Sequence, residues 1–166
     1  MKEETYLYLN EKKLKLYNND NSKFVSPQLI KYKFTDEDTA GQKEIRIVHQ
    51  LLIGKPKATH IGFTSKSVVI KLLPELKKVR YSGNLIIEVF PQIIYGQKCI
   101  LKLIPKDNLT NVIKVDFSNY ANYTLDGIKF MIGVAPLISR NKEYFVQIIV
   151  DGAESEVTNE NSFIFS

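Results

Sequence analysis

The 166-residue sequence has no tryptophan, a single cysteine and two histidines, and its hydrophobic runs are short. Because Cys99 is the only cysteine, an intramolecular disulfide and a cysteine metal site are excluded. No segment reaches the roughly 20 consecutive apolar residues of a membrane-spanning helix, so no membrane partner is expected. The stretch 1–5 lacks a basic head followed by an apolar run, which predicts synthesis in the cytoplasm without a secretory signal peptide.

Motifs that carry catalytic chemistry are also missing. His49 and His60 have no Cys, Asp or Glu at ligand spacing, whereas a zinc site needs three or four converging ligands. Glycine-rich phosphate loops and a Gly-x-Ser-x-Gly nucleophile elbow do not occur. Cys99 lies in an apolar stretch, which is typical of a buried structural thiol. The sequence therefore predicts a protein that is not an enzyme, with no cofactor and no metal.

The sequence does contain a series of short β-strand patterns. In Tyr144–Val150 both alternating faces are largely apolar, as in a central strand that is covered on both sides. Turn residues separate the strand patterns, and helix-period segments are nearly absent. The predicted fold class is all-β, an antiparallel β-sandwich. Further strands are expected at residues 5–10, 13–17, 29–34, 44–53, 60–63, 67–73, 85–90, 97–104, 111–117, 127–134 and 162–165.

One of these segments, Glu44–Ile53, is ambiguous. Ile45 and Ile47 alternate as in a strand, but the apolar residues that follow would also suit one face of a short helix. The turn signal Gly54-Lys55-Pro56 directly after it favours the strand.

The charge distribution divides the chain. Residues 1–80 hold 16 Lys and Arg against 9 Asp and Glu, a net +7, whereas residues 81–166 hold 7 against 9, a net −2. Ser82-Gly83 follows a basic connector, Glu75–Arg80, and predicts a boundary there. We therefore expect a basic N-terminal β module at residues 1–81 and a β-sandwich at residues 82–166. The asymmetry favours head-to-tail packing of copies; compositional drift in a lysine-rich proteome is the other interpretation.

Three segments of the second half carry a resemblance to a known family. They are Val89-Phe90-Pro91, the stretch Tyr95–Leu101 with its early glycine, and the tyrosine-led strand Tyr144–Ile148. This half resembles an immunoglobulin-like sandwich of the IPT/TIG type, without the cysteine pair and core tryptophan of antibody domains. Val150–Ser155 is similar to the strand exit of Ig-like modules in tail-terminator proteins of phage-tail-like contractile particles. The resemblance implies a scaffold or adhesion role.

The expected function is therefore that of a structural or interaction protein. Its partners would be other subunits of an assembly, including copies of itself, in a phage virion or phage-tail-like particle as a capsid decoration, a connector or a tail or baseplate part. The apolar stretches Val89–Ile94 and Leu125–Val134 are expected to supply contacts between subunits. The basic group Lys77, Lys78 and Arg80 is a further candidate for partner contact.

Two alternatives remain open. The first is a carbohydrate- or ligand-binding sandwich module in which exposed tyrosines stack on sugar rings, with Tyr120 and Tyr123 as candidates; both tyrosines would also suit the edge of a sandwich. The second is nucleic-acid binding by the basic first half, where clusters of basic residues lie near tyrosines such as Tyr6 and Tyr8 in the sequence. Lysine on edge strands is also a common protection against aggregation.

Overall fold

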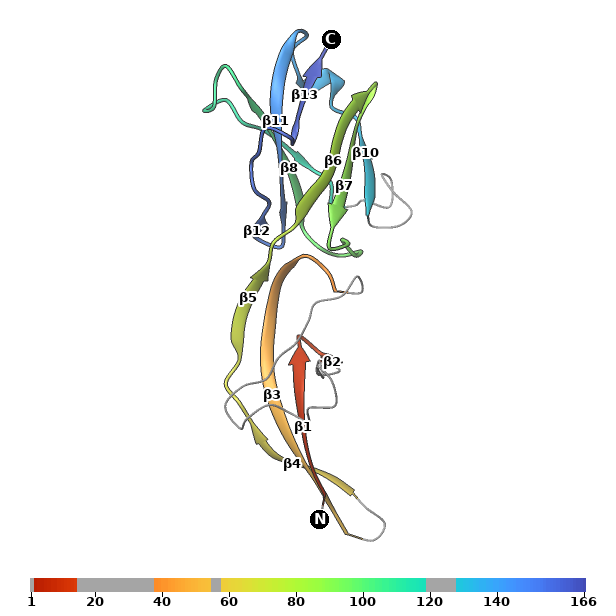
Figure 1. Cartoon of the computed structure of the whole chain (residues 1–166), viewed down its shortest axis with the longest axis vertical. Coiled ribbons are helices and arrows are strands. Elements are labelled where there is room, and N and C mark those ends of the chain that lie inside the picture. The colour runs from red at the N-terminus through yellow and green to blue at the C-terminus, as the bar shows by residue number, and fades with distance from the viewer. Residues whose placement is uncertain (1, 15–37, 55–57, 119–127) are drawn as a thin grey trace. The chain divides into compact units, whose positions relative to one another are not determined.

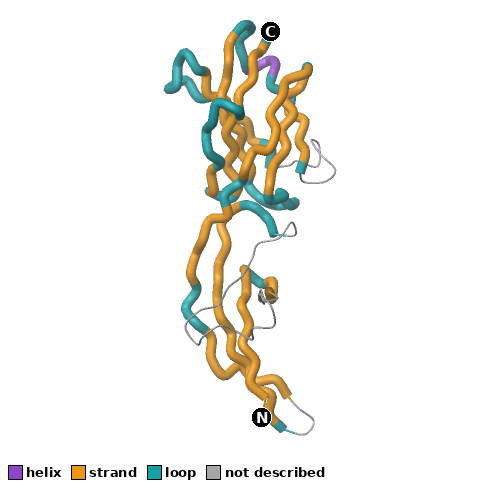
Figure 2. The backbone as a smooth tube through the Cα atoms, viewed as in Figure 1, coloured by secondary structure: helices purple, strands orange, loops and turns teal. Residues whose placement is uncertain are grey.

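The structure is a computed structural model that describes residues 2–14, 38–54, 58–118 and 128–166 (Figure 1). Over these residues the chain is all-β: its sheets are antiparallel, and the one helical turn is a short 3₁₀ turn, Ala135–Leu137 (Figure 2). Within the same residues no helix is long and apolar enough to span a membrane. The all-β class expected from the sequence is confirmed.

The chain divides into two compact units. The first comprises residues 1–35 and 43–70, and the second comprises residues 36–42 and 71–166. Strand β6 (Glu75–Ser82), which contains the boundary expected after Tyr81, pairs with β7 (Asn84–Phe90) in the second unit, and the division into domains at 1–81 and 82–166 stays a prediction. Whether each unit folds as an independent domain remains a prediction.

In the first unit a single sheet has the strand order β2-β1-β3-β4, and β5 also pairs with β3. The bounds are β1 Lys2–Leu9, β2 Lys12–Leu14, β3 Gly41–Ile53, β4 Ala58–Thr64 and β5 Val68–Leu72. The predicted hairpin is present, with Leu7 opposite Leu14 and Asn10 in the turn at a φ of 52°. Segment 44–53 is a strand, as the turn signal indicated. The predicted strand at 29–34 lies outside the described residues.

In the second unit the strands form two sheets. One has the order β10-β7-β6, where β10 is Lys129–Ile132. The other has the order β12-β11-β8-β9, with β13 also paired to β11. Its bounds are β8 Cys99–Pro105, β9 Ile113–Asp116, β11 Lys142–Val150, β12 Ala153–Glu154 and β13 Ser162–Phe165. β11 is therefore a central strand of its sheet, as predicted, but only one of its two apolar faces is buried and the other is half-buried.

The buried sides of the two sheets contribute to one hydrophobic cluster. Leu85, Ile87 and Val89 of β7 belong to it together with Leu101 of β8 and Ile148 of β11. Aromatic pairs join one sheet to the other: the ring centroids of Tyr81 and Phe163 are 5.6 Å apart, and those of Phe117 and Phe130 are 5.5 Å apart. Strand alternation explains the pattern, because every second residue of β11 is buried from Tyr144 to Val150.

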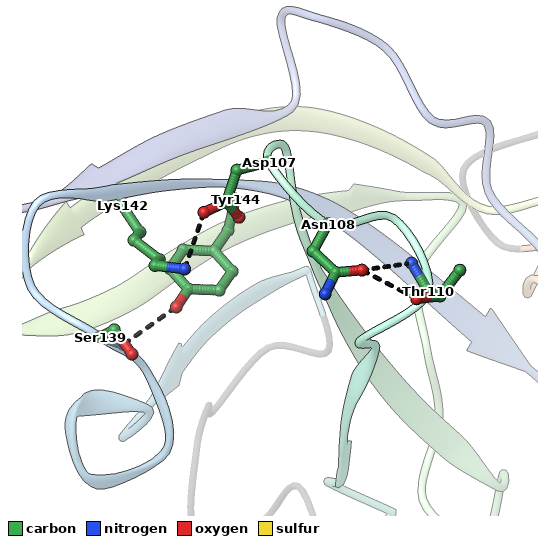
Figure 3. A network of polar contacts seen from close by, with 6 residues as sticks. All are labelled: Asp107, Asn108, Thr110, Ser139, Lys142 and Tyr144. Atoms are coloured by element: carbon green, nitrogen blue, oxygen red, sulfur yellow. Dashed lines mark hydrogen bonds and ion pairs between the residues drawn. The ribbon is translucent and has the colours of Figure 1, made fainter.

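Tyr144 is a core residue whose hydroxyl reaches the backbone. Only 2% of its surface is exposed, and its hydroxyl accepts a hydrogen bond at 2.9 Å from the N–H of Ser139, five residues earlier (Figure 3). Beside it, the Lys142 ammonium pairs at 2.7 Å with Asp107 of the β8–β9 loop. The start of β11 is thus bonded both to the preceding loop and to a neighbouring one.

The expectation of a connector at Glu75–Arg80 is wrong, because this segment is most of strand β6. A register shift between Leu76 and Lys78 leaves Lys77 as an extra residue in a β-bulge. The extra residue interrupts the period-2 alternation from which strands are predicted. Ser82-Gly83 is the tight turn between β6 and β7, where Ser82 lies opposite Asn84 and Gly83 has a φ of 74°.

Residues 38–42 belong to the second unit and are bonded to the loop between β7 and β8. Thr39 forms a parallel bridge with Gln92, and the N–H of Ala40 donates to the carbonyl of Gln92 at 3.2 Å. The buried Gln97 side chain donates to the carbonyl of Ala40 at 2.8 Å and to the Asp151 carboxylate at 2.7 Å. One side chain therefore joins three segments that are far apart in the sequence.

Candidate functional site

Two of the predicted contact residues, Lys78 and Arg80, lie on the solvent side of the β10-β7-β6 sheet. They alternate with Val79 and Tyr81, which pack against the core. Lys78 is opposite Glu88 of β7, and Glu88 is in turn opposite Lys129 of β10. A row of two cations and one carboxylate therefore crosses the sheet.

Apolar side chains lie next to this row. Arg80 is opposite the half-buried Ile86, which is opposite Met131, and 51% of the surface of Met131 is exposed. Phe90 at the end of β7 is 39% exposed, and Ile128 just before β10 is 47% exposed. We call this surface the outer face; it comprises Lys77, Lys78, Arg80, Ile86, Glu88, Phe90, Ile128, Lys129 and Met131.

The bulge residue Lys77 closes one end of the outer face. Its ammonium lies 5.6 Å from the centre of the Phe90 ring and 2.6 Å from a carboxylate oxygen of Glu75. Lys77, Phe90 and Ile128 line a shallow pocket of about 340 Å³ together with Glu88, Val89 and Gln92. All three predicted cations thus belong to one surface, where four cationic side chains lie against two carboxylates, that of Glu88 and that of Glu75 opposite Phe90.

The apolar stretches that the sequence singled out are split between core and surface. In Val89–Ile94, Val89 and Ile93 are buried, whereas Phe90 and Ile94 are exposed. In the described part of Leu125–Val134 the same alternation buries Phe130 and exposes Met131. Ile86 could not be singled out from the sequence, because alternation alone does not reveal which side of a strand lacks a second sheet.

The other predicted contacts, Tyr120 and Tyr123, lie outside the described residues. In the first unit, cations lie over two tyrosines named in the nucleic-acid alternative. The Lys13 ammonium is 3.1 Å from the centre of the Tyr6 ring, and the Arg46 guanidinium is 5.5 Å from that of Tyr8. One face of each ring is therefore next to a side chain, where a stacked base would otherwise lie.

The side chains of Cys99 and His49 have surroundings that are typical of structural residues. Cys99 is fully buried, and burial, with smaller contributions from the charges of Asp151 and Asp116, raises its pKa to about 12. Such a thiol is protonated and unreactive at neutral pH. His49 shares a 3.0 Å hydrogen bond with Thr5. Among the described residues, no group of three or more His, Cys, Asp and Glu side chains is placed to hold a metal ion.

Comparison with known proteins gives no relative from which a role can be carried over. No family model matches the chain, no curated protein matches it in sequence, and no solved structure matches its fold.

Proposed function

We propose that this chain is a structural or interaction protein of a larger assembly. In this proposal the second unit is an immunoglobulin-like β-sandwich, and its outer face is the surface that contacts a neighbouring subunit. The observation that carries the proposal is the outer face itself, where three exposed apolar side chains and the half-buried Ile86 share one surface with four cationic side chains.

The order of the strands supports the immunoglobulin-like assignment. In that fold the strands called A, B and E share one sheet, and C′, C, F and G share the other. β6, β7 and β10 take the first three places, and β9, β8, β11 and β13 take the other four. Tyr144 near the start of β11, bonded to the backbone upstream, matches the tyrosine corner of such domains.

The composition of the outer face supports a protein partner. Phe90 and Ile128 are exposed apolar side chains that line the same pocket, and Met131 is exposed opposite Ile86; apolar surface of this kind marks a surface that becomes covered. The cations at its margin favour a partner with acidic groups and would determine how that partner is oriented. Copies of the same chain meet this description, because the second unit contains 13 acidic residues against 11 basic ones.

The setting that we propose is the one implied by the sequence resemblance: a phage virion or a phage-tail-like particle. Capsid decorations, connectors and tail or baseplate parts consist of repeated subunits with extensive protein contacts. Within such a particle the second unit would act as a rigid module, and the outer face would be buried between neighbouring subunits.

The proposal is tested by the mass of the native assembly. Native mass spectrometry and light scattering of material purified from the cells that make it should give a mass above the 19.1 kDa of one chain. The double variant Arg80→Glu/Met131→Asp should shift that mass toward one chain, because it introduces acidic charge into the contact.

A matched variant on the other sheet serves as the control. Lys114→Glu/Ile164→Asp changes an exposed lysine and an exposed apolar residue in the same way, on β9 and β13. It should leave the assembly intact. If the wild type has the mass of one chain at every concentration and no partner, the proposal is contradicted. If the two double variants have equal effects on the mass, the outer face is not the surface of contact.

A further inference from the structure

A second surface feature lies at the start of β8 and shares no residue with the outer face. It is an open pocket of about 440 Å³ lined by Tyr95, Gly96, Gln97, Lys98, Asp116 and Ser118. Its volume lies within the range of about 300–1,000 Å³ that is typical of small-ligand sites. Tyr95 stands at the tip of the β7–β8 loop with 76% of its surface exposed.

The loop that carries Tyr95 is held in place on both sides. The Gln97 side chain accepts a hydrogen bond at 2.9 Å from the N–H of Ile94, and it also binds Ala40 and Asp151. The N–H of Lys98 donates at 2.9 Å to Asp151. Gly96 has a φ of 90°, a conformation that favours glycine, and no atom lies within 4 Å of the position of a Cβ there. The tyrosine ring is therefore carried by a preorganised turn, which lowers the entropic cost of binding.

The lining of the same pocket includes a charged hydrogen-bond acceptor, Asp116. Asp116 ends β9, and its carboxylate accepts a hydrogen bond at 2.8 Å from the N–H of Ser118. Hydrogen bonds from Ser118, and then the nearby Lys98 charge, lower the pKa of Asp116 below its usual value, so it is ionised at neutral pH. A carboxylate has about four acceptor positions, so Asp116 retains capacity for further donors.

These groups discriminate between classes of ligand. A phosphate would be repelled by Asp116, and an isolated cation would be repelled by Lys98. A purely apolar ligand would exclude water from Lys98 and from the acceptor positions of Asp116 that Ser118 does not occupy, and would offer no hydrogen bonds in return. A sugar ring fits all three groups: the C–H bonds on one side can lie on the electron-rich face of Tyr95, and its hydroxyls can donate to Asp116 and accept from Lys98.

We propose that the pocket between Tyr95 and Asp116 is a carbohydrate-binding site that takes a pyranose ring. Tyr95 is the stacking platform, Asp116 accepts hydrogen bonds from two ring hydroxyls, and Lys98 donates to a third oxygen. Gln97 is a positioning residue that holds the loop. The site does not depend on the outer face or on assembly.

The test starts from the full chain on a glycan array, followed by titration with the methyl glycosides of glucose, galactose, mannose and N-acetylglucosamine. Amide chemical shifts in two-dimensional NMR spectra report binding residue by residue. We expect array signal for at least one pyranoside class, with the largest shifts at Tyr95, Gly96 and Lys98. Absence of both array signal and shifts would overturn the proposal.

Variants then test the roles of the individual side chains. Tyr95→Ala should weaken binding about tenfold, whereas Tyr95→Phe, which keeps the ring, should stay within about threefold of wild type. Asp116→Asn, which keeps the shape and removes the charge, should weaken binding about fivefold. The control is Leu109→Ala, an exposed apolar residue beyond the opposite end of β8, which should have no effect.

Equal losses for Tyr95→Ala and Leu109→Ala, or for Tyr95→Phe and Tyr95→Ala, would overturn the stacking role. The mass of the native assembly should be unchanged in all of these variants. Failure of carbohydrate binding is therefore distinguishable from failure of the proposed assembly role.

Discussion

The two units of the chain differ in how they bury apolar side chains. In the second unit, strands from both sheets contribute to a common cluster, and residues such as Leu101, Phe130 and Ile148 are completely buried. The described residues of the first unit have a smaller cluster built on Leu7, Leu9 and Leu14. All seven residues of its strand β4 are exposed.

Charge increases the contrast. The first unit contains 12 basic against 5 acidic residues, a net +7, and the second contains 11 against 13, a net −2. A smaller cluster and a larger net charge both reduce the stability of a compact state. We infer from the comparison that the second unit is the more stable of the two.

The largest effect is expected when a buried leucine is replaced by alanine in each of the two units. Leu101→Ala should lower the free energy of unfolding by about 4 kcal/mol, since a fully buried side chain leaves a cavity, and Leu9→Ala by about 2 kcal/mol. Urea denaturation followed by hydrogen-exchange mass spectrometry measures the stability of each unit separately. The inference that the second unit is the more stable would be contradicted if Leu9→Ala lowered the free energy of unfolding as much as Leu101→Ala. It would also be contradicted if both units lost hydrogen-exchange protection together in each variant.

A somewhat smaller effect is expected from removing the side chain that binds residues 38–42 to the second unit. Gln97→Ala removes hydrogen bonds to Ile94, Ala40 and Asp151 and should lower the free energy of unfolding by about 2 kcal/mol. Amide exchange at residues 38–42 should rise together with exchange in the β7–β8 loop, while β1 and β2 stay as in wild type. Unchanged exchange at residues 38–42 would show that Gln97 does not hold the segment.

The smallest expected effect is the pH dependence that the single thiol, Cys99, gives to the stability of the second unit. The pKa of Cys99 is raised from 9.0 to about 12 in the folded chain, so its contribution to stability is complete below pH 9 and is lost as the pH rises toward 12. Between pH 9 and pH 12 the free energy of unfolding of the wild type should fall by up to about 1.4 kcal/mol per pH unit more than that of Cys99→Ala. Urea titrations at pH 8 and pH 10 measure the difference.

A thiol reagent provides the control for that experiment. At pH 8 it should modify Cys99 only when the second unit opens, at a rate that Leu9→Ala does not change. Rapid modification of the folded protein, or the same alkaline loss in wild type and Cys99→Ala, would contradict a buried, protonated thiol.

Much of the fold could be predicted from local patterns. The β-branched and aromatic run Tyr144–Val150 identified strand β11, and Asn10 identified the first hairpin, because both signals depend on neighbouring residues only. The strand β6 was missed because the bulge at Lys77 shifts the alternation by one residue. A one-residue insertion is invisible unless the partner strand is known.

The candidate sites were harder to predict. Lys77, Lys78 and Arg80 stood out as a basic group, yet their apolar neighbours Ile86 and Met131 come from other strands. Tyr95 was noted only as part of a strand pattern, since the charge that makes it part of a pocket comes from Asp116, 21 positions away in the sequence. Such sites depend on pairing between distant segments.

Local sequence patterns were enough to predict the all-β class and the apolar side of most strands. These properties follow from the period-2 geometry of a strand, which each segment carries on its own. The pairing of strands into sheets, the apolar residues left exposed beside Arg80 and the shared pocket of Tyr95 and Asp116 became known from the tertiary structure alone. The reason is that backbone hydrogen bonds between strands are the same for any pair, so partner choice depends on how whole faces pack together.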